Sequence, residues 1–79
     1  MNWQDYIVSD NEVLHGKPVI KETRISVEHL IDLLAQGWKM SEILENYPQL
    51  STDSLQAVFA YLRDCMDDGL LFSSIRKSA

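Results

Sequence analysis

The sequence predicts a mainly α-helical fold with a small N-terminal β-ribbon, a three-helix domain that suits a helix-turn-helix core. Short β-like runs and turn-forming residues fill the chain up to about residue 26. Beyond that point, apolar residues recur at the 3.6-residue period of helices, in three segments with short connections. A chain of 79 residues is long enough to form one core. Residues 1–79 are therefore expected to form a single domain.

The β-ribbon is expected over about residues 5–26. Two short β-like runs, at 6–8 and 12–14, begin it. Residues 17–26 then read as a hairpin, because β-prone residues stand on both sides of a turn centred on Glu22-Thr23.

Side chains alternate between the two faces of a strand, and this alternation sorts the residues of the hairpin. Across the hairpin, Val19 is expected to lie opposite Ser26. The apolar residues that would face the core are Pro18, Ile20, Ile25 and Val27. The residues that would face outward are Lys17, Val19, Lys21, Arg24 and Ser26. The three cations of the hairpin are therefore expected to converge on one exposed face.

The first helix is expected over about residues 27–36. Ser26 is a suitable N-cap, and Gly37 is expected to end the helix. Its apolar stripe has the i, i+3, i+4, i+7 spacing of one helix face and consists of Val27, Leu30, Ile31 and Leu34.

Two further helices are expected at about 42–47 and 52–68, with Ser41 and Ser51 as their N-caps. Residues 69–79 would form a C-terminal tail. The buried stripe of the third helix is expected to consist of Leu55, Val58, Phe59, Leu62 and Met66.

Charge and composition exclude several classes of protein. The net charge of −5 opposes nucleic-acid binding, which depends on phosphate neutralisation by Lys and Arg. Cys65 is the single cysteine, which excludes a disulfide framework and fits a reducing cytosol. The N-terminal residues do not resemble a signal peptide, and no apolar run is long enough to span a bilayer. We therefore expect a cytoplasmic protein without membrane contact.

No catalytic centre, metal or cofactor is expected. A metal site needs three or four convergent ligands, and His15 and His29 have no third ligand at a suitable spacing. Cys65 has no histidine at helical spacing, so nucleophilic catalysis is not indicated either.

Two blocks of the sequence resemble one known family. Gly16-Lys-Pro-Val-Ile-Lys-Glu-Thr-Arg-Ile-Ser-Val27 is similar to the signature Gly-Lys-Pro-Val-Ile-x-Gly-Thr-Arg-Ile-x-Val of the domain-of-unknown-function family 433. Ser41-Glu-Ile-Leu-Glu-Asn-Tyr-Pro-Gln-Leu50 resembles its second block, and the resemblance covers roughly residues 5–66. It implies a helix-turn-helix or winged-helix-like fold. Because members are commonly regarded as antitoxins, it also implies a small PIN-like nuclease toxin as the partner, with no enzymatic activity and no cofactor.

Glu22 departs from the signature of the family, which has glycine at this position. A two-residue type II′ turn needs a positive φ at its first central residue, which favours glycine. We therefore expect the backbone of Glu22 to be strained, and we expect Glu22→Gly to stabilise the fold.

Six residues are candidates for contact with DNA. They are Lys17, Lys21 and Arg24 on the ribbon and Thr52, Ser54 and Gln56 at the start of the third helix. The cations could bind phosphate, and the third helix would be the recognition helix of a helix-turn-helix. Two alternatives stay open. The cations can form a solvated face without a role, and the third helix can stay out of the groove because Asp53 repels phosphate.

Four apolar residues of the tail are candidates for partner binding. They are Leu70, Leu71, Phe72 and Ile75. Terminal segments of this kind can become ordered on a partner. The alternative is that they pack on the helices of this protein or across a dimer.

These observations lead to one function hypothesis with two alternatives. We expect a non-catalytic antitoxin-like protein that forms a homodimer, binds a small nuclease-like toxin and contacts its own operator DNA. The alternatives are a stand-alone DNA-binding transcriptional regulator and a protein-interaction module without DNA binding. The expectation of a toxin partner rests on the family resemblance, which is an argument by association.

Overall fold

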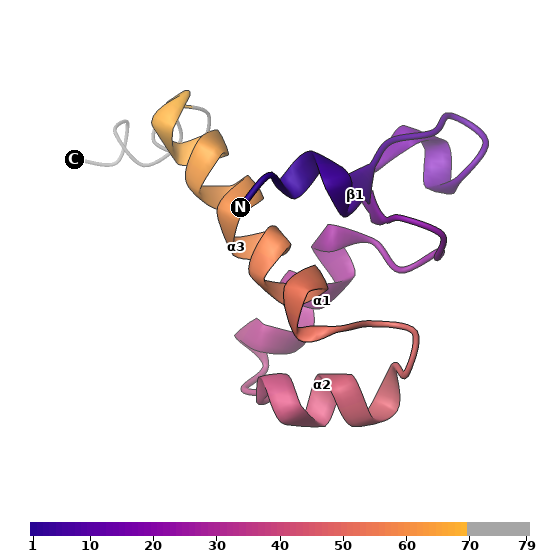
Figure 1. Ribbon diagram of the computed structural model, residues 1–79, viewed down its shortest axis with the longest axis vertical. Helices are drawn as coiled ribbons and strands as arrows, with labels where there is room; N and C mark the ends of the chain where they lie inside the picture. Colours follow the sequence, from indigo (N-terminus) through magenta and orange to yellow (C-terminus); the bar gives the residue numbers. More distant parts are fainter. Residues whose placement is uncertain (70–79) are drawn as a thin grey trace.

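The computed structural model describes residues 1–69, which form three α-helices preceded by a small antiparallel β-ribbon (Figure 1). This is the mainly helical fold class that the sequence predicts. Two short 3-10 helices, η1 and η2, stand before and after the first strand. In chain order the elements are η1 (Trp3–Asp5), β1 (Ile7–Val8), η2 (Leu14–Gly16), β2 (Val19–Ile20), α1 (Val27–Ala35), α2 (Met40–Asn46) and α3 (Thr52–Asp67).

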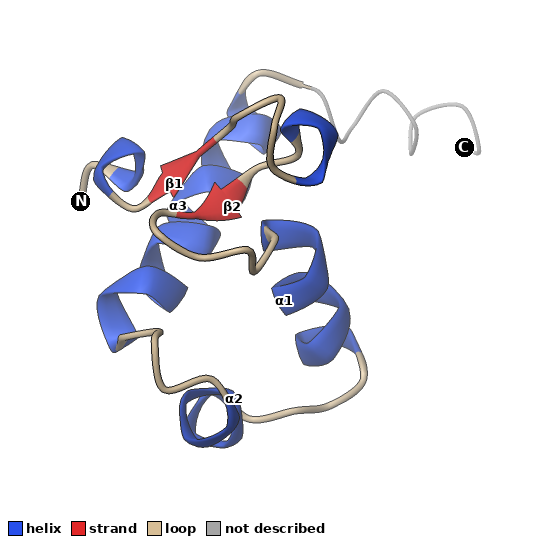
Figure 2. Ribbon diagram, turned by 90° about the vertical axis from the view of Figure 1, so that its right-hand side faces the viewer, coloured by secondary structure: helices blue, strands red, loops and turns tan. Residues whose placement is uncertain are grey.

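The ribbon pairs β1 with β2 (Figure 2). Ile7 lies opposite Ile20, and Val8 lies opposite Val19. Val19 also forms an isolated bridge with Ser26, which is the pairing predicted for the hairpin. The strand β2 therefore lies between β1 and the segment that leads into α1.

The predicted β-like run at 12–14 is not a strand. Val13 forms only an isolated bridge with Asp10, and η2 begins at Leu14. Leu14 and His15 have positive φ values of 50° and 57°. The backbone therefore leaves the extended region here, and the run cannot continue a β-ladder.

The prediction that Val19 and Ser26 face outward is wrong. Their exposed fractions are only 2% and 9%, and the neighbouring Ile20 is 3% exposed. Because β2 is covered on both faces, the alternation of inward and outward residues does not hold in this ribbon. Alternation therefore no longer supports a common face for the three cations of the hairpin, although each of them is exposed.

The helices α1 and α3 begin at the predicted serine caps. The Oγ of Ser26 accepts the backbone N–H of His29 at 2.9 Å, and the Oγ of Ser51 accepts the N–H of Ser54 at 3.1 Å. Gly37, with a φ of 95°, follows the end of α1 as predicted.

The helix α2 begins two residues earlier than predicted, at Met40 rather than Glu42. The expected cap was Ser41. Instead, the carboxylate of Glu42 reaches back and accepts the backbone N–H of Lys39 at 2.9 Å. This bond satisfies a free N–H at the start of the helix and makes Lys39 the boundary residue.

The buried face of α3 differs from the predicted one. Phe59 and Met66 are 47% and 41% exposed, whereas Leu55 and Val58 are fully buried as expected. Ala57 is fully buried as well. The small side chain of Ala57 lets the backbone of α3 approach its neighbours, so the helix is turned toward this side.

One core joins the ribbon to all three helices. Its buried members are Ile7, Ile20, Val27, Leu30, Leu33, Ile43, Leu50, Leu55, Ala57 and Val58. Partly buried aromatic residues pack against this core from outside, and they include Trp3, Tyr6, Trp38 and Tyr61.

Candidate functional site

The loop after β2 carries two of the three hairpin cations. The backbone N–H of Thr23 donates to the carbonyl of Ile20 at 3.0 Å, so Lys21 and Glu22 are the central residues of the turn. The φ of Glu22 is 64°, which confirms the expected positive φ. The expected type II′ turn is wrong, because the positive φ stands at the second central residue, as in a type II turn. The Oγ1 of Thr23 donates to the same carbonyl at 2.7 Å and accepts the N–H of Ile25 at 3.0 Å, which fixes the bend one residue earlier.

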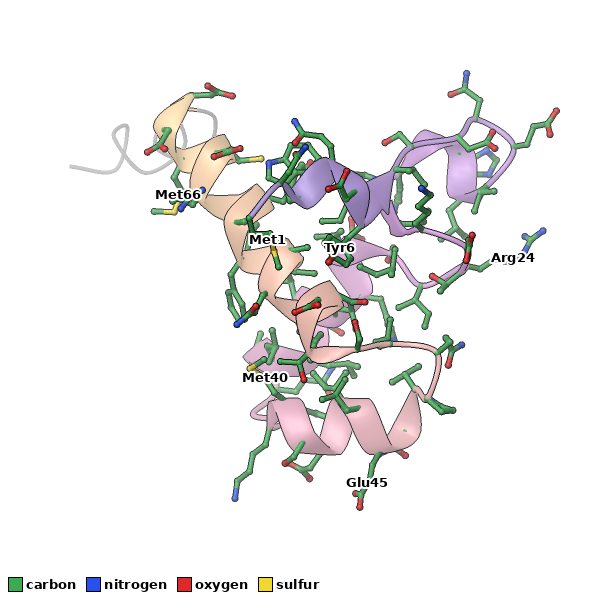
Figure 3. All side chains as sticks on the ribbon, viewed as in Figure 1. Met1, Tyr6, Arg24, Met40, Glu45 and Met66 are labelled. Carbon is green, nitrogen blue, oxygen red and sulfur yellow. The ribbon has the colours of Figure 1, made fainter. Side chains whose placement is uncertain are left out.

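The three hairpin cations differ in their surroundings. Figure 3 shows Arg24 projecting from the loop, away from the helices. Within residues 1–69, neither Lys21 nor Arg24 has an acidic partner within 4.0 Å. The Nζ of Lys17 lies 3.4 Å from the Oε1 of Glu28, and both side chains are exposed. Such exposed pairs contribute only about 0–1 kcal/mol, so Lys17 can exchange Glu28 for another anion.

The start of α3 offers two of its three predicted DNA contacts to solvent. Thr52 and Gln56 are exposed, and so is Asp53 between them. Ser54 is only 6% exposed, and its hydroxyl accepts the backbone N–H of Ser51 at 3.3 Å. Ser54 is therefore engaged in the helix cap and does not present its hydroxyl to a phosphate.

Positive charge is scarce along the two helices of the helix-turn-helix pair. Arg63 is the one cation of the sequence between residues 40 and 67, and its guanidinium lies 3.7 Å from Asp64. Five carboxylates share the same stretch: Glu42, Glu45, Asp53, Asp64 and Asp67. Their field opposes a phosphate backbone at α2 and α3.

One side of α3 presents apolar side chains to solvent. We call Phe59, Leu62 and Met66 the apolar flank of α3. Phe59 and Met66 are 47% and 41% exposed, and the half-buried Leu62 lies between them on the same side of the helix. Figure 3 shows Met66 projecting on the side away from the β-ribbon.

A shallow apolar groove lies where α1, α3 and the segment before β2 meet. It has a volume of about 260 Å³ and is lined by Pro18, Val27, Glu28, Ile31 and Tyr61. Pockets that hold small molecules usually measure about 300–1,000 Å³. The groove therefore suits a side chain of a partner better than a cofactor.

The N-terminal segment holds Tyr61, one wall of this groove, in place. The ring of Trp3 meets that of Tyr61 edge-on, with a centroid distance of 4.9 Å. The Nε1 of Trp3 donates to the Oδ2 of Asp64 at 2.6 Å. Burial raises the pKa of Tyr61 above its ordinary value, and the hydrogen bond and the electrostatic interaction with Cys65 raise it further.

Sequence reasoning missed the apolar flank because it placed Phe59 and Met66 in the core. The signal that could have found it is Ala57. Residues two apart on a helix point about 200° apart, so a buried Ala57 turns Phe59 toward solvent. A small residue in an otherwise apolar stripe often marks the closest approach of a helix to its neighbours.

The remaining predicted site residues are those of the C-terminal tail. The candidates for partner binding, Leu70, Leu71, Phe72 and Ile75, lie outside the described residues. His29 Nε2 lies 2.9 Å from the hydroxyl of Tyr47. Within residues 1–69, no three His, Cys, Asp or Glu side chains gather closely enough to hold a metal ion. In the same range, no helix is long and apolar enough to cross a membrane.

Comparison with known proteins finds a matching family model and a similar solved structure. The model of the family described as "Protein of unknown function (DUF433)" matches residues 7–62. The crystal structure of a DUF433 member protein from Anabaena variabilis ATCC 29413 is similar in fold, with a TM-score of 0.75 and 32% sequence identity. The similarity covers 82% of this chain and 64% of that chain, so this chain spans less than two thirds of the length of that relative. A search of the curated proteins gives no match.

Proposed function

The chain belongs to the DUF433 family, whose function is unknown, and from this premise we propose that it is a non-catalytic antitoxin-like protein. Its partner is a small PIN-like nuclease toxin, which it binds by surface contact without metal or cofactor. The protein and its toxin meet in the cytoplasm.

The observation that carries this proposal is the apolar flank of α3. Phe59 is 47% exposed and Met66 is 41% exposed, two helical turns apart on one side. Exposed aromatic and Met side chains are enriched at protein interfaces, where they serve as anchors in pockets of the partner. A helix face with this spacing fits an apolar groove of a second protein.

The charge of the described residues supports a nuclease as the partner. Residues 1–69 contain five Lys and Arg and all twelve Asp and Glu, a net charge of −7. A nuclease needs cationic side chains around its active site, because affinity for nucleic acid comes from phosphate neutralisation. An acidic protein is therefore attracted to the surface that the substrate uses, and it competes with the substrate for that surface.

Co-expression with the product of the adjacent gene tests this proposal. The two full-length proteins are expected to co-purify and to elute together in size exclusion. Phe59→Asp is expected to weaken the complex at least tenfold, because it buries a charge in an apolar contact. Leu14→Asp is the matched control, since Leu14 is 39% exposed but lies far along the chain from α3. If the wild-type protein does not associate with the adjacent gene product, the proposal is wrong.

A stand-alone DNA-binding regulator is the second candidate function. It is favoured by the exposed Arg24 at the loop tip and by the exposed Thr52 and Gln56 at the start of α3. In this case a homodimer would place two copies of these residues on two half-sites of an operator. A protein-interaction module without DNA binding is the remaining alternative.

Fluorescence anisotropy with the DNA upstream of the gene separates these candidates. For a DNA-binding protein, Arg24→Ala and Lys21→Ala are each expected to weaken binding. Each is also expected to reduce the slope of the logarithm of the binding constant against the logarithm of the salt concentration by about one. Lys39→Ala, at the start of α2, is the control for loss of a cation elsewhere. Unchanged binding in both loop variants would remove these two residues from the DNA interface.

A further inference from the structure

The apolar groove between α1, α3 and the segment before β2 carries one negative charge at its edge. Of the described residues that line it, only Glu28 is charged. The buried Val27 forms part of the lining, together with the half-buried Pro18, Ile31 and Tyr61. The carboxylate of Glu28 stands at the rim, because its side chain is 75% exposed. The groove therefore offers an apolar surface beside one solvated carboxylate.

The Glu28 carboxylate already holds one cation of this chain. The Nζ of Lys17 lies 3.4 Å from its Oε1, and the Lys17 side chain is 55% exposed. Bonds between a charged nitrogen and a carboxylate oxygen usually measure about 2.7–2.9 Å, so this pair is loose. Within residues 1–69, the second oxygen of Glu28 forms no hydrogen bond or ion pair. A cation with better geometry can therefore displace Lys17.

The surface around the rim is acidic. Asp32 stands one helical turn after Glu28, so the two carboxylates share one face of α1. The sequence of α1, Val27–Ala35, contains no Lys or Arg. Residues 1–69 contain five Lys and Arg against twelve Asp and Glu. A cation is therefore attracted to this side of α1, whereas a phosphate group is repelled.

We propose that the groove is a docking site for an arginine side chain of a basic partner protein. The aliphatic stem of arginine suits the apolar lining. Its planar guanidinium can bond both oxygens of the Glu28 carboxylate at once and can contact the ring of Tyr61. The ammonium of Lys17 contacts only one of these oxygens. Lys17 is therefore a competitor within the chain, which the arginine displaces.

A purely apolar side chain fits the groove less well than arginine. Such a side chain would take water away from the Glu28 carboxylate without replacing the lost hydrogen bonds, which costs free energy. Arginine is also one of the residues enriched at protein interfaces and at their hot spots. The groove thus suits a residue with an apolar stem and a cationic tip.

The identity of the protein that carries the arginine rests on the proposed function. A nuclease toxin has cationic side chains where it binds nucleic acid, and one of them can enter the groove. The groove lies on a different side of α3 from the apolar flank, because Tyr61 follows Phe59 by two residues and points about 200° away from it. The two surfaces can therefore be tested separately.

An NMR titration of the full-length, isotope-labelled protein tests the groove without a toxin. The probe is the blocked tripeptide acetyl-Ala-Arg-Ala-amide. Its control carries citrulline, which has nearly the same shape as arginine but no charge. The amide signals of α1 and of Tyr61 report occupation of the groove. We expect the arginine probe to bind with a dissociation constant in the millimolar range, and the citrulline probe to bind about fivefold more weakly.

Two variants are expected to change the affinity for the arginine probe in opposite directions. Glu28→Gln removes the charge at the rim and is expected to weaken binding about fivefold. Lys17→Ala removes the competitor and is expected to strengthen binding about twofold. The matched controls Glu45→Gln and Lys39→Ala change exposed residues at α2, and Figure 3 shows Glu45 projecting away from the rest of the molecule. Both controls are expected to bind the probe as the wild type does.

The proposal is wrong if the arginine and citrulline probes bind equally, or if Glu28→Gln does not weaken binding of the arginine probe. Self-association of the protein that is lost in Glu28→Gln would also overturn it, because a second copy would then supply the arginine.

The complex with the adjacent gene product separates this proposal from the proposed function. Glu28→Gln is expected to weaken that complex about fivefold, and Lys17→Ala is expected to strengthen it. A complex that forms but does not respond to Glu28→Gln overturns the docking of arginine and leaves the proposed function intact. Binding of the arginine probe without any association of the adjacent gene product supports the arginine site and contradicts the proposed function.

Discussion

Glu22 has a left-handed backbone conformation with a φ of 64°. This conformation costs an L-residue about 1–2 kcal/mol, because Cβ crowds the following carbonyl oxygen. Glycine avoids this cost but loses about 0.5–1 kcal/mol more conformational entropy on folding. We therefore expect Glu22→Gly to raise the free energy of unfolding by a few tenths to about 1 kcal/mol, measured by urea denaturation.

Glu22→Ala separates backbone strain from charge at the same position. It removes the carboxylate between Lys21 and Arg24 in this loop but keeps the Cβ. We expect it to change the free energy of unfolding by less than about 0.5 kcal/mol. If the alanine variant gains as much as the glycine variant, the carboxylate and not the φ angle is the cause.

Tyr61 makes the stability of the protein depend on pH in the alkaline range. Its pKa is raised above the ordinary value of about 10, first by burial and then by Cys65. Between the unfolded and the folded pKa, the folded chain holds more protons, so a rise in pH favours unfolding. The contribution is fully present below about pH 10 and is lost as the pH rises through the folded pKa.

We therefore expect the free energy of unfolding of the wild type to fall more steeply above about pH 10 than that of Tyr61→Phe. Urea denaturation at several pH values between about 8 and 11 measures both slopes. All other residues are the same in both proteins, so only the difference between the slopes belongs to Tyr61. Parallel pH profiles would show that the proton of Tyr61 is held equally in the folded and unfolded chain.

At the scale of elements, replacing a large side chain by alanine is expected to lower the free energy of unfolding much more on one side of α3 than on the other. Leu55 is fully buried, so Leu55→Ala is expected to lower the free energy of unfolding by about 2–5 kcal/mol. Phe59 is 47% exposed, so Phe59→Ala is expected to cost less than about 1 kcal/mol. Chemical denaturation of both variants measures the difference. A large loss in Phe59→Ala would place Phe59 in a covered interface in solution.

The starts of the helices follow from neighbouring residues, and the sequence therefore predicts most of them. Ser26 and Ser51 cap α1 and α3 through bonds to backbone groups three residues away. The predicted start of α2 is two residues too late. The carboxylate of Glu42 accepts the N–H of Lys39, so the helix begins before Ser41, the predicted cap. Caps are decided within one helical turn, so only a competing side chain in that turn can change them.

The faces of the elements could not be predicted equally well. Val19 and Ala57 are buried because of what packs on them from other parts of the chain. Alternation along a strand assumes that one face is open, and β2 has no open face. The candidate site could not be predicted for the same reason, because tertiary packing decides which sides of the ribbon and of α3 are exposed.

At the scale of the whole molecule, one contact joins residues that are 61 positions apart. The Nε1 of Trp3 donates to the Oδ2 of Asp64 at 2.6 Å, and the Trp3 ring packs edge-on against Tyr61. No local pattern in the sequence indicates this pairing, because each partner has many possible contacts along the chain. It fixes the N-terminal segment to the half of α3 that carries Met66.

Because this contact is distant in sequence, we expect its loss to affect the far end of α3. Trp3→Phe removes the N–H donor but keeps an aromatic ring, and it is expected to cost about 1 kcal/mol of unfolding free energy. Trp3→Ala also loses the ring contact and is expected to cost about 2 kcal/mol. Hydrogen exchange of the amides in the last turn of α3 is expected to become faster in the same order.

Trp38 provides the control, since it is the other half-buried tryptophan and lies between α1 and α2. Trp38→Phe is expected to leave exchange in the last turn of α3 unchanged, because within residues 1–69 it is Trp3, and not Trp38, whose side chain forms a hydrogen bond and an aromatic pair with α3. If Trp3→Ala changes exchange only in η1 and β1, the end of α3 does not need the N-terminal segment. The fixed position of Met66 would then have to come from the helix alone, and the N-terminal segment would be a separate, locally unfolding unit.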